Sequence, residues 1–335
     1  MNHYSSKKAI YLITSYSILL FYIFILWHLP NDWFRDRDVY QIYAENHDTF
    51  LKNDDTFKQL VNEPLFSQIA SLFSNQPELF PVCMSIFIAF IYFILVIKKS
   101  KNILTFFFAT LLLFFNTFLI FSQLFQLRQG LATALFLIIF FYIKKKNNRI
   151  ILSCILPFIH VVFFIITPIY IIYELYLQYK DPKKIILYTA LTTIIFSILS
   201  ISLMYVIGFR QADIYNNLNE GRGGGSFILH FALFIFIYFW GNRYDQRLLG
   251  WVFIGLTFYI FSYFIFPPSG RLFSSFYPFL LIYLITRNKI LDTTVLFLMS
   301  IIFTYLFFSS GYLDMLNMNA LSFNIELERF FKNLF

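Results

Sequence analysis

The chain has 335 residues, of which 59% are hydrophobic and 13% charged, and it includes 48 Phe and 23 Tyr. A soluble domain does not need so much apolar surface, and the apolar runs repeatedly reach the ~20 residues that span a bilayer. The net charge of +8 does not indicate nucleic-acid binding, because the lysines form short clusters between apolar runs, as on the cytoplasmic side of membrane proteins. The composition therefore predicts an all-α, polytopic membrane protein.

Ten apolar runs follow one another along the chain. They cover residues 9–28, 81–97, 103–122, 127–143, 150–178, 185–207, 227–240, 248–266, 271–286 and 290–308. The first run has a basic lead and no small-residue cleavage site, which predicts a retained helix rather than a signal peptide. With the N-terminus inside, the acidic loop at 29–80 lies outside, and its sequence predicts short helices between the first two membrane helices.

The run at 150–178 is too long for one comfortable crossing. If it breaks near Pro157–His160 and returns, more lysines and arginines face inward than if it crosses once, which favours the break. Broken helices at membrane depth are tolerated where they line a cavity. This choice predicts about ten or eleven membrane segments in a single membrane domain over 1–335. It also predicts that the amphipathic C-terminal segment lies outside and that loops 29–80 and 208–226 cover a cavity.

Three arginines, Arg128, Arg222 and Arg271, stand at the N-terminal ends of helices that run from outside to inside. A cation is unfavourable at that end of a helix, and near membrane depth it costs about 2.5–3.5 kcal/mol without a partner. Arginine forks and helix N-termini are natural ligands of phosphate. The pattern predicts a diphosphate site, and the alternative is that each arginine pairs with an acidic residue of the 29–80 loop.

Further candidate residues lie in the membrane and in the outer loop. Helical rise places His160 ~16 Å beyond Arg149, where an imidazole is either a proton acceptor or a satisfied structural group. Carboxylates interleaved with aromatic rings suit a sugar site but are also typical of any solvated loop. These residues are Asp36, Asp38, Tyr40 and Glu63. No metal or nucleotide motif occurs, so we expect no cofactor and a metal-independent reaction.

Five stretches resemble, in order, the EpsG/Wzy-type polysaccharide polymerases over roughly residues 30–285. They are "DRDVYQIYAENHDTF", "NEPLFSQIASLF", "LRQGLATALFL", "ILPFIHVVFFI" and "SGRLFSSFYPFLLIYL". The resemblance implies a GT-C-like membrane glycosyltransferase with roles for Arg128, His160 and Arg271. The glycine-rich "GRGGGS" around Arg222 departs from the family pattern.

The resemblance also implies the reaction. Repeat units on a polyprenyl diphosphate carrier are joined at the outer face of the bacterial cytoplasmic membrane, where a sugar hydroxyl attacks an anomeric carbon and diphosphate leaves. His160 or Asp38 would accept the proton. The predicted substrate-binding residues are Arg128, Gln129, Arg222, Arg271, Asp36, Tyr40 and Glu63. The expected partners are the lipid-linked oligosaccharide, the bilayer and a regulator of chain length.

Two other functions remain open at this point. A membrane O-acyltransferase would also have about ten helices with an essential His and Arg, although its early arginine-plus-histidine signature is missing here. A flippase for lipid-linked oligosaccharides would be expected to show internal repeat symmetry, and no repeat is visible in the sequence.

Overall fold

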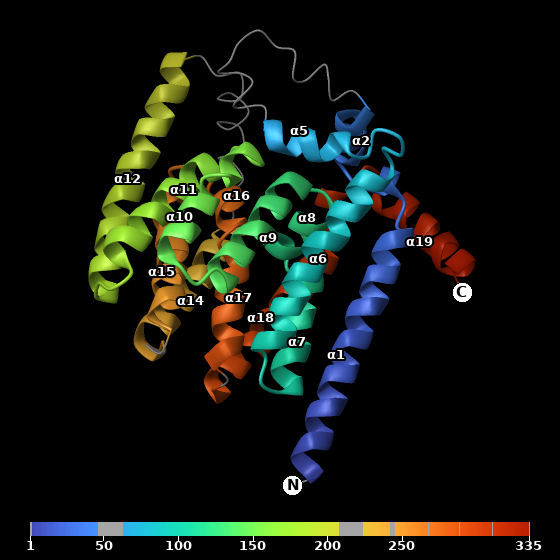
Figure 1. The fold of residues 1–335 in the computed structure, drawn as a ribbon, viewed down its shortest axis with the longest axis horizontal. Coiled ribbons are helices and arrows are strands. Elements are labelled where there is room, and N and C mark those ends of the chain that lie inside the picture. Colours follow the sequence, from blue (N-terminus) through green and yellow to red (C-terminus); the bar gives the residue numbers. More distant parts are fainter. Residues whose placement is uncertain are drawn as a thin grey trace. The chain divides into compact units, whose positions relative to one another are not determined.

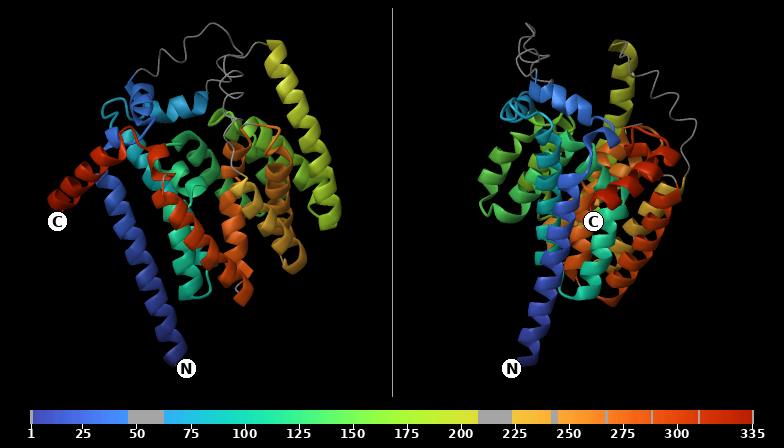
Figure 2. Two further views of the ribbon diagram at one scale, coloured as in Figure 1. Left: turned by 180° about the vertical axis from the view of Figure 1, so that it is seen from behind. Right: turned by 90° about the vertical axis from the view of Figure 1, so that its right-hand side faces the viewer.

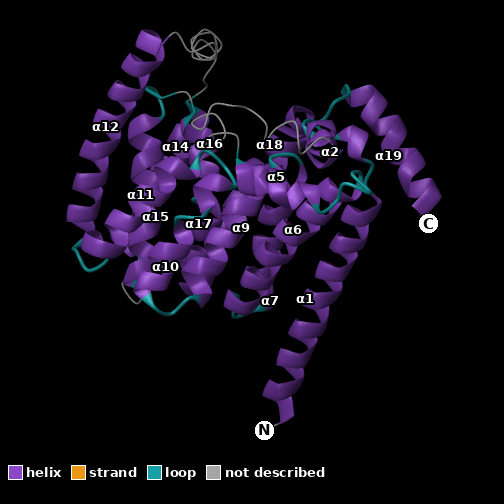
Figure 3. Cartoon of the chain, turned by 45° about the horizontal axis from the view of Figure 1, so that its top comes forward, coloured by secondary structure: helices purple, strands orange, loops and turns teal. Residues whose placement is uncertain are grey.

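The computed structural model describes residues 2–45, 63–207, 224–241, 245–266, 268–287, 289–309 and 311–334. Helices account for nearly all of this part of the chain, and no strand is drawn in it (Figure 3). The prediction of an all-α protein is confirmed.

Four helices in the described part are long and apolar enough to cross a membrane. They are α1 (Asn2–His28), α6 (Leu79–Lys99), α12 (Pro182–Ile207) and α18 (Ile290–Ser309). A further span is broken into α7 (Ile103–Phe115) and α8 (Thr117–Leu124), which are bent by 61°. The shorter apolar helices are α9 (Leu127–Tyr142), α11 (Phe163–Ile172) with its continuation η3 (Tyr173–Leu177), α14 (Gly225–Trp240) and α15 (Gln246–Ser262). The chain is a polytopic membrane protein, and the number of crossings stays a prediction.

The chain divides into two compact units. Unit 1 comprises Met1–Thr167 and Leu284–Phe335, and unit 2 comprises Pro168–Tyr283. Each unit has its own buried core. The prediction of a single membrane domain stays a prediction.

One end of unit 1 collects the basic clusters. Near it the Tyr11 hydroxyl donates to the Ile97 carbonyl at 2.8 Å, which places the start of α1 beside the end of α6. Lys98 Nζ donates to the Tyr142 hydroxyl at 3.3 Å, which adds the end of α9. We call this the basic end, and it holds Lys8, Lys98, Lys101, Lys144 and Lys289. Clusters predicted to face the same side of the membrane therefore lie together.

The opposite end of unit 1 holds the short helices of the predicted outer loop, α2 (Arg37–Glu45) and α5 (Pro64–Ser71), and we call it the loop end (Figure 1). Phe66 of α5 packs on Phe80 at the start of α6, with ring centroids 5.2 Å apart. The predicted helices in this loop are confirmed where the loop is described, and residues 46–62 lie outside the described part.

The C-terminal segment returns to the loop end. Phe34 forms an isolated antiparallel bridge with Leu316, and the Arg35 side chain donates to the Leu316 carbonyl at 2.9 Å. The helix that follows, α19 (Ala320–Leu334), lies at the loop end (Figure 2). Its Phe323 packs against Trp33, with ring centroids 5.4 Å apart. The C-terminal segment and the outer loop thus lie at the same end of unit 1, and the prediction that both face outside stays a prediction.

The segment predicted to break does so. Helix α10 (Lys146–Ser153) ends before the short 3-10 turn η2 (Leu156–Phe158), and α11 starts at Phe163. The Thr167 hydroxyl donates to the Ser153 carbonyl at 3.1 Å, so the chain turns back and lies beside its own entry. This reversal places His160 in a turn between the two helices. Helical rise from Arg149 therefore overstates the depth of His160, because α10 is not continuous up to that residue.

A glycine brings α9 unusually close to α8. A Cβ atom on Gly130 would lie 2.0 Å from the Ser122 carbonyl oxygen and 2.8 Å from Ile88 Cδ1. Such distances are far below van der Waals contact, so only glycine permits this approach. Since Arg128 is one half-turn earlier on α9, the close contact also fixes where that arginine stands.

Unit 2 packs around an indole ring. Trp251 of α15 is fully buried, and its ring lies 5.3 Å from the Tyr170 ring and 4.9 Å from the Phe276 ring, measured between centroids. The run predicted at 271–286 forms two helices, α16 (Ser269–Ser274) and α17 (Tyr277–Arg287), and the end of α17 belongs to unit 1.

Candidate functional site

Arg128 lies where the sequence predicted it, at the N-terminal end of a helix. It is the second residue of α9, whose first turn holds no acidic residue and whose N-cap makes no side-chain hydrogen bond. Its Nη1 atom donates to Oε2 of Glu63 at 2.7 Å. The sequence predicted either a phosphate ligand or an acidic partner from the 29–80 loop for Arg128. The acidic partner is present in this structure.

Glu63 also contacts His160, the histidine predicted to lie within the membrane. Its Oε1 atom lies 2.5 Å from His160 Nδ1 and accepts the Val161 backbone N–H at 3.0 Å. The residue is buried, with only 3% of its surface exposed. One carboxylate therefore connects the start of α5, the start of α9 and the turn before α11. We call Glu63, Arg128, His160 and Val161 the Glu63 cluster.

The backbone of Glu63 is strained to make these contacts. Its φ of 57° and ψ of 58° lie in the left-handed region, which costs a residue other than glycine about 1–3 kcal/mol. Pro64 follows at the first position of α5, where its fixed φ suits the start of a helix. The strain persists because the carboxylate is held from three directions.

The surroundings of Glu63 favour its charged form. Burial raises the pKa of the Glu63 carboxyl, but the hydrogen bond and charge of His160, the charge of Arg128 and the Val161 N–H together outweigh it. The net pKa lies below its ordinary value. Glu63 is therefore a carboxylate at neutral pH, with positive and polar donors on both oxygens.

The contact with Glu63 determines which nitrogen of His160 carries a proton. A carboxylate only accepts hydrogen bonds, so Nδ1 is the donor and, in the neutral ring, Nε2 has the free lone pair. The His160 side chain is 16% exposed. A carboxylate that orients an imidazole in this way is the arrangement used for a general base.

Aromatic rings line the other side of Arg128. Its guanidinium carbon is 5.8 Å from the centroid of the Tyr40 ring and 5.6 Å from that of Tyr43, within the range of cation–π attraction. The Tyr40 hydroxyl donates to the Phe125 carbonyl at 2.8 Å, and burial raises the pKa of Tyr40 to about 12. Tyr40 is thus uncharged at neutral pH, and its ring packs against the guanidinium of Arg128.

Three other predicted site residues lie in unit 1 without entering the cluster. Asp36 and Asp38 are exposed, and within the described residues no hydrogen bond or ion pair links either carboxylate to Glu63, Arg128 or His160. Asp36 has a positive φ of 63° and starts α2 by accepting the Tyr40 N–H on its carbonyl. Gln129 is buried in α9 at 3% exposure.

The remaining two arginines, Arg222 and Arg271, belong to unit 2 by their position in the chain. Arg271 is exposed on the six-residue helix α16 of unit 2. Arg222 lies outside the described residues, together with the rest of 208–223. A diphosphate site shared by all three arginines stays a prediction. Among the described residues there is no group of three or more metal-ligating side chains.

Sequence reasoning missed Arg37, which fixes α2 in place. It is fully buried and donates from Nε to the Leu124 carbonyl at 2.8 Å and from Nη2 to the Ser85 hydroxyl at 2.9 Å. Burial lowers the pKa of Arg37 to about 10. In the stretch "DRD" the flanking carboxylates drew attention as sugar ligands, yet the arginine between them is the residue that enters the protein.

The chain was compared with known proteins. A family model described as the EpsG family matches residues 6–325. Searches of curated proteins and of solved structures found no match to the chain. The matched range contains the whole Glu63 cluster and nearly the entire sequence. The chain therefore belongs to the EpsG family.

Proposed function

We propose that the protein is a membrane glycosyltransferase that polymerises repeat units of a surface polysaccharide carried on a polyprenyl diphosphate. The observation that carries the proposal is the Glu63 cluster, in which one carboxylate holds both a histidine suited to remove a proton and an arginine suited to bind phosphate. Membership of the EpsG family supports the same class of function.

His160 is the general base of the proposed reaction. The acceptor sugar hydroxyl donates its proton to Nε2, and its oxygen attacks the anomeric carbon of the donor sugar. As the new glycosidic bond forms, the bond from that carbon to the carrier diphosphate breaks and the diphosphate leaves. Glu63 keeps the proton of Nδ1 in place and balances the charge that His160 gains.

Arg128 is the residue that we assign to the leaving diphosphate. A guanidinium has five N–H donors, and the pair with Glu63 uses Nη1, so donors are left for a phosphate. The Arg128 side chain is 30% exposed, which allows a ligand to reach it. A fixed cation at the place where negative charge develops lowers the barrier to departure. Arg271 and Arg222 are proposed further contacts.

The proposed place of action is the outer face of the bacterial cytoplasmic membrane. Lysines gather at the basic end of unit 1, and the Glu63 cluster lies at the loop end. The excess of positive residues faces the cytoplasm in membrane proteins. With this orientation the cluster opens outward, where lipid-linked units would be joined.

Polysaccharide length in a strain that carries His160→Gln tests the function. Glutamine keeps a similar size but removes the base, so we expect single repeat units at a normal protein level. His28→Gln, the same change at an exposed histidine, should leave long polymer. Full-length polymer lacking acyl groups would instead indicate an acyltransferase, and loss of all surface product would indicate a flippase. Either result contradicts the proposal.

A further inference from the structure

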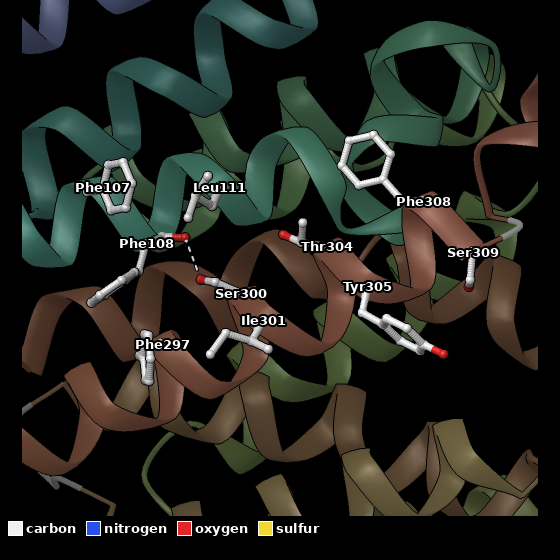
Figure 4. A pocket seen from close by; sticks show the side chains of 10 residues that line it. All are labelled: Phe107, Phe108, Leu111, Phe297, Ser300, Ile301, Thr304, Tyr305, Phe308 and Ser309. Atoms are coloured by element: carbon white, nitrogen blue, oxygen red, sulfur yellow. Dashed lines mark hydrogen bonds between the residues drawn. The ribbon is translucent and has the colours of Figure 1, made fainter. Parts of the chain in front are cut away.

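The seam between α7 and α18 is open along one face of unit 1. A cavity of about 640 Å³ lies between the two helices, with Phe108, Phe297 and Tyr305 among its walls (Figure 4). A second cavity of about 450 Å³ shares Phe108 and Phe297 and extends to Asn102 and to Ile290 at the start of α18. We call the two together the α7–α18 groove.

The walls of this groove suit a hydrocarbon chain. Ser300 lies in the groove, but its hydroxyl donates to the Phe108 carbonyl at 3.1 Å and to the Leu296 carbonyl at 2.7 Å, so it needs no ligand. Large apolar side chains such as Leu104 and Tyr305 are 59% and 72% exposed there. The 20 residues of α18 extend for about 30 Å, the thickness of the hydrocarbon core of a bilayer.

The groove leads to positive charge at the basic end. A third cavity, of about 690 Å³, shares Asn102 with the groove and is lined by Lys8, Tyr11 and Lys101. Both lysines are exposed, and no acidic side chain of the described residues lines any of the three cavities. Lys289 directly precedes Ile290, a residue of the groove wall. The α7–α18 groove is therefore apolar along its length, and lysines line the cavity at its basic end.

We propose that this surface binds an anionic glycerophospholipid of the leaflet at the basic end. The phosphate lies between Lys8 and Lys101, and an acyl chain follows Leu104 and Phe108 into the groove. Charge complementarity selects this occupant, because basic pockets between membrane helices on the cytoplasmic side bind anionic head groups. A zwitterionic head group carries no net charge for the two lysines to attract. The proposal is independent of the polymerase function.

Lipid binding to the purified full-length protein in a neutral detergent tests the head-group contact. Phosphatidylglycerol and phosphatidylcholine with the same acyl chains are titrated, and bound lipid is counted by native mass spectrometry. We expect the wild type to prefer phosphatidylglycerol, and the double variant Lys8→Gln/Lys101→Gln to lose about tenfold or more of that affinity. The control, Lys144→Gln/Lys145→Gln, removes the same charge at the same end but outside the cavities, and should bind normally.

A second pair of variants tests the chain contact. Leu104→Trp adds bulk inside the groove at an exposed position, so folding should be preserved and binding of phosphatidylglycerol weakened. Leu298→Trp makes the same change at an α18 residue that is half-exposed but does not line the cavities, and should have no effect. Equal binding of the two lipids, equal loss in both lysine pairs, or binding of a polyprenyl phosphate that phosphatidylglycerol does not displace would overturn the proposal.

Discussion

At the scale of single residues, Glu63 is the point on which the candidate site depends. Its carboxylate holds Arg128 and His160, and its own backbone is held in a left-handed conformation by those contacts. Glutamine has the shape of glutamate but cannot make the same contacts, because its amide has one acceptor oxygen and no charge. We therefore expect even this isosteric replacement to destabilise the protein.

Glu63→Gln should lower the free energy of unfolding by roughly 1.5–3 kcal/mol at pH 7, the value of hydrogen bonds to charged groups. The pKa of Glu63 is lower in the folded than in the unfolded chain, so its contribution is complete above the unfolded value of about 4.3. It is lost as the pH falls through the lowered native pKa. The difference between variant and wild type in detergent melts should thus shrink below about pH 4.

The control for this experiment is Glu78→Gln, which makes the same change at an exposed residue and should not alter the melting temperature. A difference between Glu63→Gln and wild type that stays unchanged below pH 4 would show that Glu63 has an ordinary pKa, and one that grows as the pH falls would show a raised pKa.

Arg128→Lys separates the two roles of the arginine. A lysine ammonium can still pair with Glu63, so the protein should stay folded, but it lacks the fork that binds phosphate through two parallel N–H bonds. We expect polymer formation to fall at least about tenfold, as for the loss of a donor to a developing anion. Arg128→Ala should reduce both polymer and folded protein, because Glu63 loses a partner. Near-normal chain length in Arg128→Lys would defeat the diphosphate role.

At the scale of helices, the approach of α9 to α8 positions Arg128. Gly130→Ala would place a methyl group 2.0 Å from the Ser122 carbonyl oxygen, so α9 must move away from α8. Overpacking of this kind costs about 1–3 kcal/mol, and melting in detergent should detect it. The matched control is Gly225→Ala at the start of α14, where a Cβ meets nothing within 4 Å. An unchanged melting temperature for Gly130→Ala would contradict the close packing.

The helices of this protein could be predicted better than the contacts of its site. Apolar length alone located the ten runs, and excess length with Pro157 indicated the reversal before α11. The bend between α7 and α8 had a weaker signal, the single capping residue Asn116 between two apolar halves, and sequence reasoning missed it. Glu63 and His160 were each identified, but their contact joins positions 97 residues apart, and no local pattern encodes it. The sequence also left open whether Arg128 pairs with a ligand or with an acidic residue. The contact with Glu63 became visible only in the three-dimensional structure.

At the scale of the whole molecule, the two ends of unit 1 should lie on opposite sides of the membrane. Single cysteines are introduced after Cys83→Ser and Cys154→Ser remove the native thiols. An impermeant thiol reagent added to intact cells should label Asn75→Cys and Asn319→Cys at the loop end but not Lys101→Cys or Asn147→Cys at the basic end. All four positions are exposed in the structure. Labelling of a basic-end cysteine would refute the orientation.

A fifth cysteine tests the reversal at the level of topology. If the segment 150–178 enters and returns, Asn217→Cys in the 208–226 loop should be labelled together with Asn75→Cys. Protection of Asn217→Cys alone would mean that the segment crosses once, and the predicted approach of Arg222 to an outer site would then be wrong.

The bridge between Phe34 and Leu316 has a consequence for biosynthesis. Arg35 and its partner Leu316 are 281 residues apart, so a ribosome adding about 5–20 residues per second needs about 15–60 s to supply the second after the first. Arg37 finds the Leu124 carbonyl much earlier, and all residues of the Glu63 cluster have been made once Val161 emerges. The residues of the Glu63 cluster can therefore come into contact early in synthesis. The contact of Arg35 with Leu316, which holds the outer loop to the C-terminal segment, can form only after the final membrane helix has been translated.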